Sequence, residues 1–205
     1  MEKKDIINRI VDAEWRMFRT VNGEARVSCQ EDRITFDGMR RAQFSLWSGE
    51  TLESYLDDLT EAEQTGRNLL REKYLHMTLI SNPGTDIPRD ALPPANAETD
   101  VLVDAVWTLL LPRTIALREA YPYISARGRP LRTRDEPNGY PSVETYQKGE
   151  LMTLSPRTLR LLLEHLRRME SQGDDYVRAV QEASVRALGY ASLDAAEAAV
   201  ASGQI

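Results

Sequence analysis

The stretch INRIVDAEWRMFRTV, residues 7–21, decides the fold class of this chain. Its apolar side chains recur every three or four positions, which is the spacing of one face of an α-helix. The residues that define this face are Ile7, Ile10, Val11, Phe18 and Val21. We therefore predict a helix here that ends at Asn22-Gly23.

The same periodicity continues along most of the chain. It predicts further helices over residues 36–47, 51–80, 101–119, 142–152, 156–172, 174–189 and from 192 onward. Pro112 should kink or divide the helix over residues 101–119, and Ser155-Pro156 is a strong start signal for the helix over residues 156–172. No alternating strand pattern of useful length occurs, so the only β structure expected is a short hairpin near residues 26–35.

These patterns predict a mainly α fold. We expect an irregular helical bundle of about seven to eight helices with long loops and at most a small β-hairpin. Residues 1–205 should form a single helical domain. The proline-rich segment 82–97 is predicted to be a loop, and it is the best position for a mobile segment or an internal boundary.

The composition excludes several classes of protein. The chain has 205 residues, of which 41% are hydrophobic and 28% charged, and its net charge is −6. This balance suits a folded globular protein and argues against binding to nucleic acid or to an anionic membrane. The most apolar stretch, 101–111, is too short to span a bilayer. A single cysteine, Cys29, allows no intrachain disulfide, so we expect a cytoplasmic protein.

Polar residues interrupt the apolar faces of the first two predicted helices. Glu14 shares the face of Ile10 and Phe18, while Arg40 and Gln43 share a face with aromatic residues on the next helix. A buried carboxylate needs a partner or a proton. The structural interpretation is an internal salt bridge between Glu14 and Arg40.

The functional interpretation is a polar pocket between helices. The loop that follows the first helix favours this interpretation through Arg26, Ser28, Cys29, Gln30 and Asp32. The segment 51–80 adds Tyr55, Arg67, Asn68, Lys73 and Tyr74. We favour a close helix crossing at Gly66 within this segment, and the alternative is a helix break that gives a ligand access.

The irregular segment 121–141 carries several arginines, including Arg127 and Arg129. Because they alternate around Gly128, both would project to one side of an extended backbone. We predict that at least one reaches a cluster of Arg26, Arg40 and Arg67. The alternative is a solvated basic loop, balanced by neighbouring carboxylates.

Several short motifs occur between about residue 5 and residue 170. They are Glu14-Trp15 with Phe18, Ser28-Cys29-Gln30, Met39-Arg40 with Gln43, Ser54-Tyr55 with Asp58-Leu59, Gly66-Arg67-Asn68-Leu69, Glu72-Lys73-Tyr74, Arg127-Gly128-Arg129-Pro130, Ser142-Val143-Glu144-Thr145-Tyr146 and Gly149-Glu150-Leu151. Together they resemble the uncharacterised bacterial family called domain of unknown function 4125. The resemblance implies one domain and carries over no established activity. Leu75-His76 departs from the family pattern, which makes His76 a poor candidate for a shared catalytic role.

Familiar catalytic and cofactor motifs are missing from the sequence. It has no phosphate-binding loop, no dinucleotide fingerprint and no Gly-x-Ser-x-Gly element. The two histidines, His76 and His165, lack the spacing of a zinc or di-iron site. We therefore expect neither a cofactor nor a metal. Cys29 fits a small buried residue better than a nucleophile, because no histidine is placed beside it.

Two functions fit these residues. In the first, an enzyme holds an anionic substrate, a carboxylate or a phosphate, with arginines and performs cofactor-independent acid–base chemistry. Its catalytic residues would be Glu14, Lys73, Tyr74 and Glu144; its binding residues would be Arg26, Cys29, Gln30, Arg40, Gln43, Tyr55, Arg67, Asn68, Arg127, Arg129 and Tyr146.

The alternative is a non-catalytic ligand-binding, regulatory or interaction protein. Its buried charges would form a structural ion-pair network, to which Glu14, Glu144 and Glu150 could supply carboxylates. The two functions differ in one feature of the structure. An enzyme requires these side chains to converge on a cavity that water can enter, whereas a scaffold closes them into ion pairs.

Overall fold

The computed structural model describes residues 1–21, 32–137 and 140–203. Helix accounts for 71% of these residues, and they contain no strand. The ten α-helices of the described ranges are α1 (Lys3–Phe18), α2 (Arg33–Phe44), α3 (Gly49–Gln64), α4 (Leu69–Ser81), α5 (Ala97–Ala120), α6 (Pro122–Arg127), α7 (Val143–Leu151), α8 (Pro156–Ser171), α9 (Tyr176–Ala187) and α10 (Leu193–Ala201). One 3-10 helix, η2, spans Thr133–Asp135. The mainly α class is confirmed.

The prediction of seven to eight helices is wrong, partly because residues 51–80 form two helices. Gly66 adopts a left-handed backbone with φ of 73° and terminates α3. The Arg67 amide donates to the Ala62 carbonyl, and the Gly66 amide donates to the Glu63 carbonyl. This pair of bonds is a Schellman motif, which satisfies the carbonyls at the helix end. Gly66 is therefore a helix terminator and not a crossing point.

Two further expectations are corrected in part. Of the two effects expected of Pro112, a kink or a division, the division does not occur, because α5 is continuous over 24 residues. Both Pro112 and Thr108 are exposed, so solvent can hydrate the carbonyl that loses its hydrogen bond. The segment 121–141 contains α6 and η2 and is less irregular than predicted. Of the expected hairpin, residues 33–35 belong to α2, and residues 26–31 lie outside the described residues.

Side-chain caps fix the starts of most helices. Eight helices begin with an Asp, Asn or Ser whose side chain accepts a hydrogen bond from a first-turn amide. Such caps satisfy backbone donors that a helix leaves unpaired. Ser155 caps α8 ahead of Pro156, as the sequence predicts. Asp32 and Ser192 are the caps of α2 and α10.

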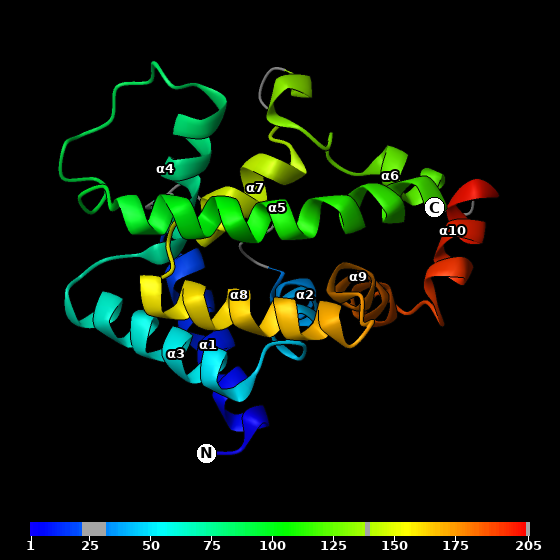
Figure 1. Ribbon diagram of the computed structural model, residues 1–205, viewed down its shortest axis with the longest axis horizontal. Helices are drawn as coiled ribbons and strands as arrows, with labels where there is room; N and C mark the ends of the chain where they lie inside the picture. The colour runs from blue at the N-terminus through cyan, green and yellow to red at the C-terminus, as the bar shows by residue number, and fades with distance from the viewer. Residues whose placement is uncertain (22–31, 138–139, 204–205) are drawn as a thin grey trace.

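The helices form one continuous bundle, in which α4 packs against α7, α2 against α9 and α3 against α8 (Figure 1). The long helix α5 lies alongside α8 and contacts α7 and α9, while α1 packs against α2, α3 and α4. The main core lies between these helices and includes the fully buried Ile10, Val11, Leu52, Leu59, Val106 and Leu159. A smaller cluster joins α6, α9 and α10 near the C-terminus. None of the described helices is both long and apolar enough to cross a membrane.

Helices α4 and α7 approach each other closely at Gly149. A Cβ atom placed there would lie 2.5 Å from the Met77 Cγ and 3.1 Å from the Lys73 carbonyl oxygen. The second contact involves backbone, which cannot move as freely as a side chain. The glycine therefore lets α7 pack directly against α4, and this packing places Glu150 beside Lys73.

We predict that Gly149→Ala lowers the free energy of unfolding by about 1–3 kcal/mol, because the added methyl group forces the two helices apart. Chemical denaturation measures this change. Gly84→Ala is the matched control, since its Cβ would meet no atom within 4 Å. Equal stability of the two variants would contradict the proposed close crossing.

Candidate functional site

A buried ion pair joins α1 to α2. Glu14 on α1 has no exposed surface, and the side chain of Arg40 on α2 is 11% exposed. The Arg40 Nε donates to Glu14 Oε2 at 2.6 Å, and its Nη2 donates to Oε1 at 2.5 Å. The Tyr55 hydroxyl of α3 donates to the same Oε1 at 2.7 Å. The structure thus contains the salt bridge that the helix faces predict.

A second carboxylate, Glu150 on α7, extends this arrangement. Its Oε1 accepts hydrogen bonds from Arg40 Nη1 at 3.1 Å and from Gln43 Nε2 at 2.9 Å. Its Oε2 accepts from Lys73 Nζ at 2.6 Å. The Gln43 Oε1 in turn accepts from Arg40 Nη1 at 2.8 Å. We call these residues together with Glu14 and Tyr55 the ion-pair network; it connects α1, α2, α3, α4 and α7.

The ion-pair network is balanced in charge and shielded from solvent. It contains two carboxylates, Glu14 and Glu150, and two cations, Arg40 and Lys73. Burial alone would raise the pKa of Glu150, but Arg40 and Lys73 outweigh it and hold that pKa well below its usual range. Burial opposes the charge on Lys73, yet Glu150 raises the pKa of Lys73 overall. Lys73 is therefore held as an ammonium ion and not as a base active near neutral pH.

An aromatic ring links the network to the segment after α6. The Lys73 ammonium lies 3.6 Å from the centre of the Tyr146 ring, and the Arg129 guanidinium lies 5.0 Å from the same ring. Arg129 also donates to the Pro141 carbonyl at 3.0 Å. It approaches the network through Tyr146 and does not contact Arg40. Arg127 is exposed at the end of α6.

Other residues selected from the sequence lie elsewhere. Arg67 forms a two-point ion pair with Glu72, at 2.9 Å and 2.7 Å, beside a different cavity that also contains His76. The Asn68 side chain caps α4 and donates to the Met17 carbonyl. These contacts position α4 against α1.

Tyr74 and Glu144 are also separate from the network. Tyr74 is 36% exposed and lines a cavity near Tyr140, while Glu144 lies 3.7 Å from Arg132 and accepts from the Thr133 amide. Three predicted binding residues lie outside the described residues: Arg26, Cys29 and Gln30. Among the residues that are described, no group of three or more potential ligands could hold a metal ion.

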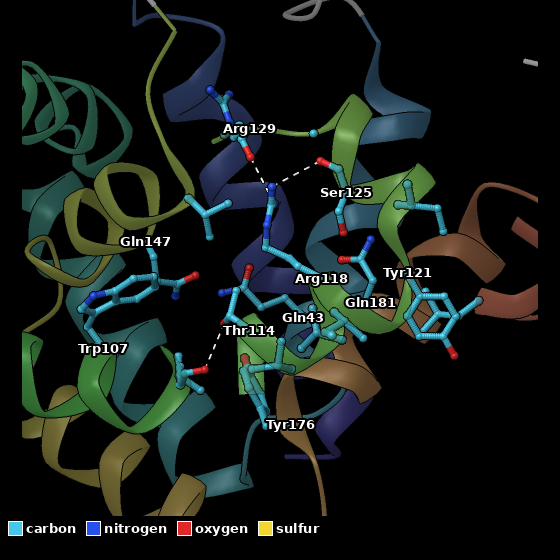
Figure 2. Close-up of a pocket in the computed structure, with 18 residues that line it drawn as sticks. Gln43, Trp107, Thr114, Arg118, Tyr121, Ser125, Arg129, Gln147, Tyr176 and Gln181 are labelled. Carbon is cyan, nitrogen blue, oxygen red and sulfur yellow. Dashed lines mark hydrogen bonds between the residues drawn. The ribbon is translucent and has the colours of Figure 1, made fainter. Parts of the chain in front are cut away.

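A cavity of about 310 Å³ adjoins the ion-pair network (Figure 2). Helices α5, α6, α7 and α9 form most of its wall, and Gln43 of the network reaches it from α2. The side chain of Arg118 on α5 lies at its centre in Figure 2, whereas the guanidinium of Arg129 points away from Arg118. We call this space the Arg118 cavity.

Arg118 has no carboxylate partner in the described part of the chain. It donates to the Arg129 carbonyl at 3.1 Å and more weakly to the Ser125 carbonyl at 3.4 Å. No described Asp or Glu lines the cavity. Two neutral carbonyls do not neutralise a guanidinium, so the cavity presents positive charge. The Arg118 guanidinium is the group in this cavity with which an anion can pair.

Arg118 is not among the residues predicted from the sequence, although the sequence contains a signal for it. Thr114 and Arg118 fall on the face of α5 that carries Trp107, Leu110 and Tyr121, and all five line the cavity. Polar residues on an apolar face were the signal that identified Glu14. A basic residue in the last turn of a helix is also favourable for the helix itself. Arg118 can therefore be explained without a site, and its place on the apolar face is easily overlooked.

The fold and the site define a helical protein that has a charge-balanced interior beside a positively charged cavity. Comparison with models of known families identifies the family of the chain. It belongs to the family described as protein of unknown function, DUF4125, whose model matches residues 4–198. The resemblance found in the sequence motifs is thus confirmed. No curated protein and no solved structure matches the chain significantly.

We predict that Glu14→Gln lowers the free energy of unfolding by about 3–5 kcal/mol, because it leaves Arg40 buried next to a neutral partner. Urea denaturation measures the loss. Glu63→Gln breaks a surface pair with Arg16 and should cost no more than about 1 kcal/mol. If both variants were equally stable, the buried pair would not hold the fold together.

The low pKa of Glu150 predicts a dependence of stability on pH. The folded-state pKa lies below the ordinary value of 4.5, so the carboxylate stabilises the fold above that pH. This contribution is lost as the pH falls through the acid range. We expect Glu150→Gln to flatten the loss of stability between about pH 5 and pH 3, measured by denaturation at each pH. The surface variant Glu98→Gln should lose stability with falling pH as the wild type does. If Glu150→Gln also lost stability in parallel with the wild type, Glu150 would not have a lowered pKa in the folded protein.

Proposed function

We propose that the protein binds a small organic anion in the Arg118 cavity, and that the ion-pair network is the scaffold of this site. The single observation that carries the proposal is the guanidinium of Arg118, which lies within a cavity whose described lining has no carboxylate. Arginine matches carboxylates and phosphates with paired hydrogen bonds. A bound anion supplies the charge that the carbonyl partners lack.

The apolar wall of the cavity supports an organic ligand over an inorganic ion. Leu117, Ile124, Val143 and Val180 line it from four different helices. Sites for small molecules combine such apolar walls with a few polar groups that fix the orientation of the ligand. An inorganic ion would leave this apolar surface in contact with water.

The geometry favours binding without acid–base catalysis. Glu14 and Lys73 are enclosed in ion pairs, and neither lines the Arg118 cavity. The lining offers the phenols of Tyr121 and Tyr176, but burial raises the pKa of both above the usual range. A general acid or base works best when its pKa lies near the working pH. The proposal is therefore a ligand-binding protein with a structural ion-pair network.

Arg118→Gln tests this proposal. We expect at least one of octanoate, phenylacetate and citrate to bind the wild-type protein in calorimetric titrations. The variant should bind that anion at least about tenfold more weakly, because charged hydrogen bonds contribute about 1.5–3 kcal/mol. Arg113→Gln is the matched control, since Arg113 is exposed on the same helix.

The control should bind as the wild type does. Melting curves without ligand show whether Arg118→Gln is folded. If all three anions fail to bind the wild type, or if the folded variant binds them equally well, the proposed function is wrong.

A further inference from the structure

The Arg118 cavity contains three glutamine side chains in addition to the guanidinium. Gln43, Gln147 and Gln181 come from α2, α7 and α9, which are far apart in the sequence. In the view of Figure 2, Gln147 and Gln181 lie on opposite sides of Arg118. Each amide offers two donor and two acceptor positions. The lining is therefore richer in hydrogen-bonding groups than the binding of one anion requires.

The ion-pair network fixes the orientation of the Gln43 amide. Arg40 can only donate, so the atom that faces it at 2.8 Å must be the oxygen Oε1. The ionised Glu150 only accepts, so the atom that faces it at 2.9 Å must be the nitrogen Nε2. One hydrogen of Nε2 and one lone pair of Oε1 remain. Gln43 consequently presents a preoriented amide at the wall of the cavity.

The side-chain amides of Gln147 and Gln181 have hydrogen-bond donors and acceptors available for a ligand. The two amides form no hydrogen bond with any residue that the structure describes, and both residues are partly buried. Water satisfies such groups until a ligand displaces it. A ligand that carries only a carboxylate would leave them unpaired, whereas a ligand with its own amide offers both a donor and an acceptor. Sites built to hydrogen-bond a ligand discriminate strongly against analogues that lack the matching group.

On the basis of the proposed function, we infer that the ligand is a small carboxylate that also bears a carboxamide, in the chemical class of the N-acylated amino acids. Its carboxylate pairs with Arg118, its amide meets the glutamines, and its side chain lies against the apolar wall. The cavity volume of about 310 Å³ is at the lower end of the range for small-molecule sites, which fits a ligand of this size.

Three probes test the inference by calorimetric titration of the full chain: N-acetylleucine, octanoate and N-acetylleucinamide. Octanoate keeps the carboxylate and lacks the amide, while N-acetylleucinamide lacks the carboxylate. We expect N-acetylleucine to bind at least about tenfold more tightly than either. In the Gln181→Leu variant, the preference for N-acetylleucine over octanoate should fall to about threefold or less. The affinity of this variant for octanoate should be no lower than that of the wild type. Gln64→Leu is the control, since Gln64 is exposed at the end of α3.

The outcomes separate this inference from the proposed function. If octanoate binds as tightly as N-acetylleucine and depends on Arg118, the amide assignment is wrong and the anion site stands. The amide assignment is also wrong if Gln181→Leu and Gln147→Leu both keep the full preference for N-acetylleucine. If N-acetylleucinamide binds as tightly as the acid, or if no probe binds, this inference is wrong. The proposed function fails with it only if phenylacetate and citrate do not bind either.

Discussion

The structure depends on one buried charge. Glu14 has no exposed surface, and an ionised carboxylate in that position is unstable by several kcal/mol unless other groups neutralise it. Arg40 supplies the charge and Tyr55 a further hydrogen bond. Arg40 then needs more acceptors, which Gln43 and Glu150 provide. The requirement to pair each buried group in turn brings five helices into one fixed arrangement.

This arrangement separates the structural role from the binding role. The ion-pair network is closed, so its charged groups satisfy one another and have little to offer a ligand. Its effect on the neighbouring cavity is geometric, because it fixes the Gln43 amide and the position of α7. Arg118 lies outside the network, and no carboxylate of the described residues pairs with its charge. A site supported in this way is preorganised, and a ligand then loses less binding energy to ordering the protein.

Local patterns in the sequence predicted the helical class and the pairing of Glu14 with Arg40, because both follow from which residues share a helix face. Gly66 was misinterpreted because the apolar periodicity continues past it, and only the left-handed backbone shows that α3 ends there. The position of Glu150 could not be predicted in this way, because it depends on how closely α7 packs against α4, which is distant from it in the sequence. Arg118 was not predicted as a site residue, because a basic residue in the final turn of a helix is common and needs no functional explanation.

We place the anion site beside the ion-pair network and not within it. A crystal structure of the protein grown with N-acetylleucine distinguishes the two positions. We expect the carboxylate of the ligand against the Arg118 guanidinium, with the hydrogen bonds from Arg40 to Glu14 and from Lys73 to Glu150 intact. A ligand carboxylate bound to Arg40 or Lys73 in place of Glu14 or Glu150 would contradict this placement.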